Sequence, residues 1–128
     1  MPGLPRGYAF KRELELTPRE AAAMLKEGRL LLIDCRTMPE YEYAHVPGSV
    51  HIPLDELERR RDEIEPAEGQ AVAVLCHHGV RSMKGTLALR ALGVAGCRSV
   101  AGGIDSWSLG ADAAVKRYER AGGVISSI

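Results

Sequence analysis

The sequence has no excess of charge of either sign, because its 128 residues include 17 Lys and Arg against 17 Asp and Glu. A neutral chain exerts no general attraction on phosphate backbones or anionic lipid, so we expect neither nucleic acid nor membrane as a partner. No apolar run approaches the length that spans a bilayer, and the first residues lack the apolar core of a secretory signal. These absences predict a cytoplasmic protein.

Cysteine is also scarce. Cys35, Cys76 and Cys97 are too few, and odd in number, for a disulfide framework, so at least one thiol is free. The sequence has no internal repeat and no low-complexity segment. Its length fits one domain built on one core.

What is present is an alternation of helical and strand patterns. Thr17-Pro18-Arg19-Glu20 has the form of a capping box with proline at the first helical position, and it predicts a helix that ends near Gly28. The apolar runs 30–33 and 72–75 are too short for helices and are typical of buried parallel strands. Turn residues and periodicity predict further helices at 40–45, 55–65, 82–92, around Trp107 and at 113–121, and strands at 49–54 and 98–101.

This order implies an α/β fold with a mainly parallel sheet, helices on both faces and right-handed crossovers. Ligands of such sheets bind beyond the carboxyl ends of the strands. Asp34-Cys35-Arg36 and Cys76 both fall at that edge. We assign residues 122–128 no role.

The segment from Val74 to Ser82 carries the chemistry: a strand, a six-residue loop that begins at Cys76, and the start of a helix. A thiol held there faces unpaired backbone N–H groups and the positive end of a helix dipole, and both favour the thiolate nucleophile. Gly79 lets the loop adopt positive φ, so that its N–H groups can converge on an anion. Arg81 adds a permanent cation.

Five segments, in this order along the chain, resemble the rhodanese family. They are Asp34-Cys35-Arg36 after a strand, Glu42 to Ser49 with its His45-Val46-Pro47-Gly48 core, Ile52-Pro53-Leu54, the loop Cys76 to Arg81, and Gly102-Gly103-Ile104-Asp105-Ser106-Trp107. The resemblance implies a rhodanese-like three-layer fold with about five strands over residues 14–110. Residues 1–13 and 111–128 are then N-terminal and C-terminal extensions.

The resemblance also implies a reaction, the transfer of sulfane sulfur through a persulfide on Cys76. A donor such as thiosulfate supplies the sulfur, and a thiol, cyanide or a sulfur-relay protein accepts it, with no cofactor. In this interpretation Cys76 and Arg81 are catalytic. The anion-binding loop consists of His77, His78, Gly79, Val80, Arg81 and Ser82.

Two other functions stay open. A carrier or partner-binding module would use the same fold without turnover. A small phosphatase or arsenate reductase is disfavoured because four residues separate Cys76 from Arg81, whereas the related phosphatases place five there. Fewer amide donors would then face the phosphate oxygens.

The remaining polar residues are predicted to support the loop. We expect Asp34 and Arg36 to orient the sheet edge through an ion pair or hydrogen bonds. Cys35 stands where the family commonly has valine, and it is either a buried substitute or a resolving thiol. We expect no metal site, because the adjacent side chains of His77 and His78 should diverge and no second ligand pair stands at zinc-like spacing.

Overall fold

The computed structural model describes all residues, 1–128. Its core is a five-stranded sheet in the order β1-β5-β4-β2-β3, in which every neighbouring pair is parallel. The predicted α/β fold with a parallel sheet is confirmed. The strands are β1 (Glu15–Leu16), β2 (Leu30–Asp34), β3 (Val50–His51), β4 (Ala71–Leu75) and β5 (Arg98–Val100).

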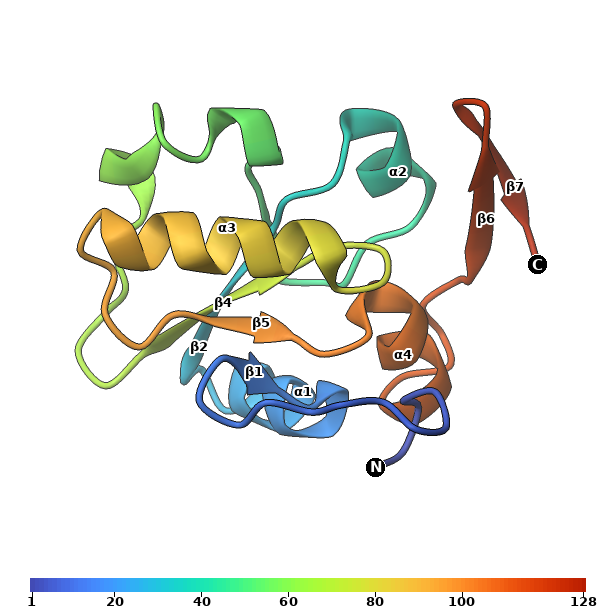
Figure 1. Ribbon diagram of the computed structural model, residues 1–128, viewed down its shortest axis with the longest axis horizontal. Coiled ribbons are helices and arrows are strands. Elements are labelled where there is room, and N and C mark those ends of the chain that lie inside the picture. Colours follow the sequence, from blue (N-terminus) through green and yellow to red (C-terminus); the bar gives the residue numbers. More distant parts are fainter.

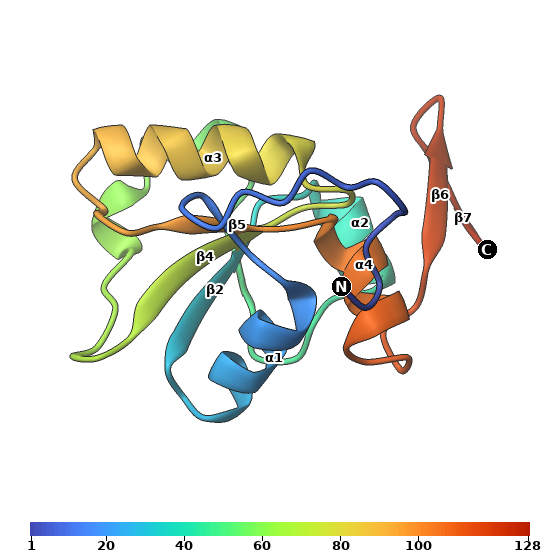
Figure 2. The same ribbon diagram turned by 60° about the horizontal axis from the view of Figure 1, so that its bottom comes forward.

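Helices cover both faces of this sheet (Figure 1). One face carries α3 together with two short 3-10 turns, and the other carries α1 and α4 (Figure 2). The helical segments are α1 (Pro18–Lys26), α2 (Met38–Tyr43), η1 (Leu54–Glu56), η2 (Arg61–Glu63), α3 (Val80–Ala91) and α4 (Gly103–Gly110). None of these helices is long and apolar enough to cross a bilayer.

Two apolar cores explain why β2 and β4 read as continuous apolar runs. Leu32 and Leu75 pack with Trp107 in the core under α1 and α4. Ile33 and Val74, one residue away along each strand, pack in the core under α3. Successive side chains of a strand point to opposite faces, so both faces must be apolar when both are covered.

The capping box predicted for α1 is confirmed. The backbone N–H of Glu20 donates to the Thr17 hydroxyl, and the Glu20 carboxylate accepts from the Thr17 N–H at 3.0 Å. These two bonds give partners to backbone N–H groups at the helix start that have no acceptor within the helix.

Two predicted helices are wrong. Residues 55–65 form only the 3-10 turns η1 and η2, because Leu57 and Ile64 are the only apolar side chains that reach the core and too few remain to bury a helix face. The stretch 113–121 ends instead in strand β6 (Tyr118–Ala121), which pairs with β7 (Val124–Ser127).

The Gly122-Gly123 pair determines this hairpin. Both glycines have positive φ, 56° and 80°, as a two-residue hairpin turn requires. The hairpin lies outside the main sheet, beside the end of the sheet where β4 runs into α3 (Figures 1 and 2).

The predicted strand 49–54 is reduced to Val50–His51. Beyond it, the N–H groups of Ile52 and Leu54 still donate to the carbonyls of Asp34 and Cys35, both at 3.0 Å.

Candidate active site

Cys76 follows β4 directly at the carboxyl edge of the sheet. It is 1% exposed, and its side chain belongs to the core under α3. Its sulfur is nevertheless not surrounded by hydrocarbon alone. The backbone N–H of Gly79 donates to Sγ at 3.0 Å, and the Ser82 hydroxyl lies 3.2 Å from Sγ.

A second serine extends this polar contact. The hydroxyls of Ser82 and Ser99 are 2.7 Å apart and both are buried. When Cys76 is ionised, Ser82 is free to donate to the sulfur because Ser99 can donate to Ser82. The sequence singled out Ser82, but nothing in it connected Ser99 to the site.

The loop after Cys76 is shorter than predicted. Helix α3 begins at Val80, so the loop spans four residues rather than six, and Arg81 and Ser82 lie in the first helical turn. Gly79 is the N-cap residue with φ of 102°. This left-handed conformation, which glycine adopts readily, turns the Gly79 N–H toward the sulfur at the positive end of the helix dipole.

The start of α4 fixes the other side of the loop. The N–H groups of Ile104 and Asp105 donate to the carbonyls of Cys76 and His77 at 2.8 and 3.2 Å. A Cβ on Gly103 would stand 2.4 Å from the His77 oxygen, so only glycine permits this approach. The Gly102-Gly103 pair therefore brings α4 against the loop of residues 76–79, which we call the active loop.

Arg81 does not hydrogen-bond the sulfur. Its guanidinium makes two hydrogen bonds, of 2.7 and 2.9 Å, to the carboxylate of Glu40. Glu40 is fully buried and also accepts from the Tyr118 hydroxyl at 2.5 Å and from Arg120 at 3.0 Å. Burial alone would raise the pKa of Glu40, but the bonds from Arg81 and Tyr118 hold it well below its usual range.

This carboxylate is the main residue that sequence reasoning missed. The Thr37-x-x-Glu40 spacing is a second capping-box signal, and the Thr37 hydroxyl does donate to Glu40 at 2.9 Å. That signal could have marked Glu40 as helix-capping. Its long-range partners, Tyr118 and Arg120, come from the C-terminal hairpin and depend on the tertiary fold.

Asp34 and Arg36 form a fully buried ion pair of 2.7 Å at the end of β2. The remaining guanidinium donors reach the carbonyls of Ala44, at 2.7 Å, and Glu40, at 3.3 Å. The pair thus ties the end of the strand to Glu40 within α2 and to Ala44, the C-cap residue of that helix. Neither residue bonds Cys76.

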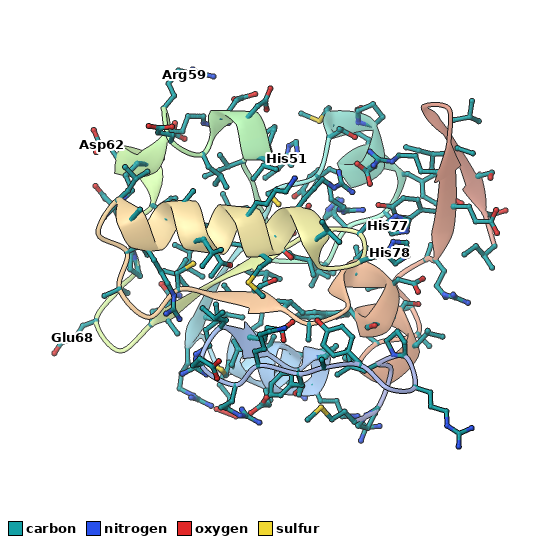
Figure 3. The ribbon with its side chains drawn as sticks, in the orientation of Figure 1. His51, Arg59, Asp62, Glu68, His77 and His78 are labelled. Atoms are coloured by element: carbon teal, nitrogen blue, oxygen red, sulfur yellow. The ribbon has the colours of Figure 1, made fainter.

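His77 and His78 do not diverge as predicted. Their rings lie side by side (Figure 3) and stack with centroids 3.8 Å apart. The ring of His77 also stacks on Tyr118, with centroids 4.0 Å apart. Burial, followed by the charge of His78, lowers the pKa of His77 to about 4. His77 is therefore neutral at pH 7, and its Nε2 lies 3.1 Å from the Tyr118 carbonyl.

The two histidines and Asp105 offer ligand atoms within 4.8 Å of one another. The Asp105 carboxylate is already paired with Arg117 at 2.8 Å, and Arg117 and Arg120 line the same cavity of about 330 Å³. Two arginines make this an unfavourable place for a metal cation. The predicted divergence of the two histidines was wrong, and the positive charges of Arg117 and Arg120 are a separate reason against a cation here.

Tyr8 reaches the loop from the N-terminal segment. Its hydroxyl hydrogen-bonds buried Glu15 and lies 3.8 Å from the place a Gly79 Cβ would occupy. Burial and the bond to Glu15 raise the pKa of Tyr8 to about 12, so the hydroxyl keeps its proton. The active loop is thus flanked by Tyr8 on one side and by Tyr118 on another.

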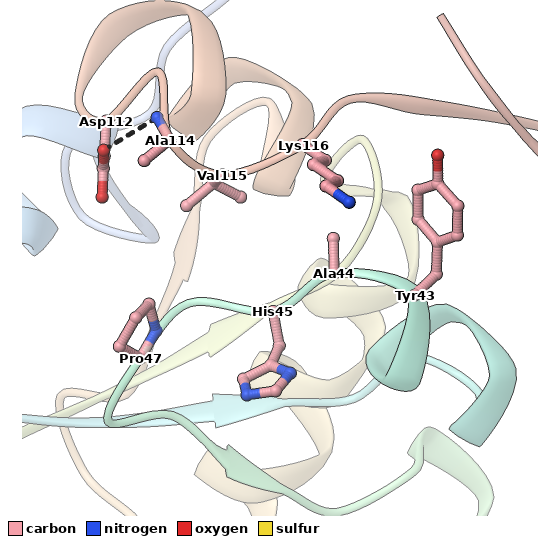
Figure 4. Close-up of a pocket in the computed structure, with 8 residues that line it drawn as sticks. All are labelled: Tyr43, Ala44, His45, Pro47, Asp112, Ala114, Val115 and Lys116. Atoms are coloured by element: carbon pink, nitrogen blue, oxygen red, sulfur yellow. Dashed lines mark hydrogen bonds between the residues drawn. The ribbon is translucent and has the colours of Figure 1, made fainter.

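A separate pocket of about 190 Å³ lies between the segments 43–47 and 112–116 (Figure 4). Tyr43, His45 and Lys116 contribute to its wall. No residue of the segment 76–82 lines it, so we assign it no part in cysteine chemistry.

The fold and the site together define a class of protein. It is a parallel α/β domain in which a cysteine follows a strand, precedes a helix and has its sulfur held by polar contacts. The family model described as "Rhodanese-like domain" matches residues 17–109. The chain belongs to the rhodanese-like domain family.

Relatives agree with this assignment. A Bacillus subtilis protein named "Putative sulfur carrier protein YrkF" is 37% identical over 79 residues, which is 62% of this chain and 42% of that protein. The human "Thiosulfate:glutathione sulfurtransferase" is 32% identical over 101 residues, covering 69% of this chain and 87% of the relative. A solved human single-domain sulfurtransferase superposes with a TM-score of 0.64 at 28% identity, covering 73% and 93% of the two chains. The chain spans only 21% to 42% of the length of four of these curated relatives, the Bacillus protein included.

Proposed function

We propose that this protein transfers sulfane sulfur from a small donor such as thiosulfate to a thiol or cyanide, through a persulfide on Cys76. The observation that supports this most is the hydrogen bond of 3.0 Å from the Gly79 N–H to Sγ at the start of α3. A donor and a helix dipole aimed at one sulfur favour its anionic form. A persulfide is also an anion, so the same contacts serve the intermediate.

The reaction then has two displacements. The Cys76 thiolate attacks the outer sulfur of thiosulfate, the S–S bond of the donor breaks, and sulfite leaves with the bonding pair. A thiolate or cyanide next attacks the terminal sulfur of the persulfide, and the Cys76 thiolate is regenerated. Such a double displacement predicts ping-pong kinetics.

Arg81 enters this proposal as a positioning residue. Because Glu40 holds its guanidinium through two hydrogen bonds, Arg81 fixes the first turn of α3 and adds positive charge near the loop without contacting the sulfur. His77, neutral at pH 7, contributes packing rather than charge. The backbone N–H groups at the loop and the helix start remain the proposed anion-binding groups.

The same arrangement disfavours phosphoryl transfer. A phosphate ester needs a free cation and several donors around its oxygens. Here the Arg81 guanidinium is occupied by Glu40.

A passive sulfur carrier is the second candidate, favoured by the name of the Bacillus relative, a putative sulfur carrier protein. A carrier would accept one sulfur atom on Cys76 but would not pass it to small acceptors repeatedly. Measuring thiocyanate formed from thiosulfate and cyanide separates the two functions. Many turnovers per chain support the enzyme, and one equivalent supports the carrier.

The decisive variant is Cys76→Ala, with Cys97→Ala as the matched control because both cysteines are buried beside β-strands. We expect wild type and Cys97→Ala to gain one sulfur atom by intact mass and to form thiocyanate. Cys76→Ala should do neither, while its circular dichroism stays unchanged. Sulfur uptake by Cys76→Ala would refute the proposal.

A further inference from the structure

The second cysteine at the sheet edge, Cys35, stands next to Cys76. Asp34 of β2 and Leu75 of β4 are the last register partners of these parallel strands, and each cysteine follows one of them. The Cys35 N–H donates to the Leu75 carbonyl at 2.9 Å, so the strands stay paired to this point. Neighbouring strands lie about 4.7–4.9 Å apart, within the Cα separation that a disulfide spans, about 4.4–6.8 Å.

The two thiols also share one face of the sheet. Cys35 follows Ile33 by two residues and Cys76 follows Val74 by two, and all four side chains belong to the core under α3. Cys35 is 2% exposed and Cys76 is 1% exposed, so both thiols lie in the same buried core. The strand register makes Cys76 the reactive group that Cys35 is placed to meet.

Cys97 offers an internal comparison. It is buried in the same core. However, Arg98 pairs with Ala73, so Cys97, one residue earlier, lies beside residue 72 near the start of β4. Four residues of strand separate that level from Cys76, roughly 13 Å. Cys97 is thus a third buried thiol that cannot reach the active sulfur.

We propose that Cys35 is a resolving residue that expels the bound sulfur as hydrosulfide when no external acceptor arrives; this rests on the proposed function. The Cys35 sulfur attacks Sγ of the Cys76 persulfide, and a Cys35–Cys76 disulfide bond forms while the bond to the terminal sulfur breaks. The Cys35 proton passes to the leaving sulfur. The persulfide anion and one thiol become a disulfide and one hydrosulfide anion, so charge and atoms balance.

No outside oxidant is needed. The sulfane sulfur is reduced to hydrosulfide, and the two cysteine sulfurs supply the electrons by joining in the disulfide. The protein would then be inactive until a low-molecular-weight thiol reduced that bond. This would give the domain a second, self-limited activity, the release of hydrosulfide.

The release should be slow at neutral pH. Burial, then the charges of Cys76 and Asp34, raise the pKa of the Cys35 thiol, and Arg81 opposes them only in part. The side chains packed against it from the 3-10 turns and α3, such as Leu57 and Leu89, carry no charge. Since the thiolate attacks, the rate should rise about tenfold per pH unit below that pKa.

The test uses the full chain, loaded with sulfur from thiosulfate or inorganic polysulfide, then freed of donor and kept without thiols. Intact mass follows the added sulfur, a sulfide electrode follows release, and peptide mapping locates any disulfide. The variants are Cys35→Ala and the matched Cys97→Ala. Cys35→Val, which fills the space that alanine would leave empty, is the second variant if alanine impairs folding.

We expect wild type and Cys97→Ala to release one hydrosulfide per persulfide and to end two hydrogens lighter than the reduced chain, with Cys35 linked to Cys76. Cys35→Ala should keep its sulfur at least tenfold longer. Equal loss from Cys35→Ala and wild type, or a disulfide that includes Cys97, overturns this inference alone. If neither donor forms a persulfide on Cys76, both the proposed function and this inference fail.

Discussion

The buried carboxylate of Glu40 allows the sharpest test of how the site is held together. It accepts hydrogen bonds from Arg81, Tyr118, Arg120 and Thr37, from three separate parts of the chain. Replacing it by glutamine keeps the shape of the side chain and one acceptor oxygen. The substitution removes the charge that compensates the two arginines.

The expected cost follows from burial. Removing one partner of a buried ion pair costs about 3–5 kcal/mol, since the other charge is left uncompensated. The Arg81 side chain is 22% exposed, so water recovers part of that cost. The amide of glutamine recovers part of the hydrogen bonding. We therefore expect Glu40→Gln to lower the free energy of unfolding by about 2–3 kcal/mol, or roughly 8–12 °C in Tm.

The control is a carboxylate with similar geometry but no burial. Glu63 accepts two hydrogen bonds from Arg60, both of 2.9 Å, yet its side chain is 55% exposed. Exposed pairs of this kind contribute little, because solvent screens them. Urea unfolding, followed by the fluorescence of the single, buried Trp107, measures both variants, and we expect no resolvable change for Glu63→Gln.

Acid titration gives a second readout for Glu40. Its pKa is depressed in the folded protein, so its contribution is fully present above the ordinary value of 4.5 and is lost as pH falls toward the folded value. Glu40→Gln should lack this part of the acid dependence. If Glu40→Gln and Glu63→Gln cost the same, or if both keep the wild-type acid profile, the network does not stabilise the site as argued.

Two further predictions concern the active loop. His77 has a folded pKa of about 4 against an ordinary 6.5, so the unfolded chain takes up the proton first and stability falls as pH drops through that window. His77→Phe keeps an aromatic ring against Tyr118 but cannot be protonated. We expect the free energy of unfolding to fall by about 1–2 kcal/mol less between pH 7 and pH 4.5 in this variant than in wild type. An equal fall in both proteins contradicts the lowered pKa of His77. Gly79→Ala places a Cβ on a residue with φ of 102°, 3.3 Å from the Gly102 nitrogen. We expect it to lower the free energy of unfolding by about 1–2 kcal/mol and to slow persulfide formation, followed by intact mass. Wild-type rates would show that the Gly79 conformation is dispensable.

The elements that the sequence predicted correctly are those set by local rules. The capping box at Thr17 dictates the start of α1, and short apolar runs covered on both faces dictate β2 and β4. The position of Cys76 between a strand and a helix also follows from the local pattern. Of the two wrong helices, 55–65 has too few apolar residues for periodicity to decide. The stretch 113–121 ends in a strand because the Gly122-Gly123 turn pairs it with β7.

The partners of the active loop were decided by contacts between distant segments. Sequence marked Arg81 as a cation but could not say that Glu40, 41 residues away, would hold it, or that Tyr118 would stack on His77. The sequence also marked Cys35 as unusual, but only the register of β2 and β4 shows that its thiol lies beside Cys76. Local patterns determine which segments become strands and helices, because propensity and capping act within a few residues. Which side chains share one buried site depends on how those elements pack, and only the tertiary structure decides that.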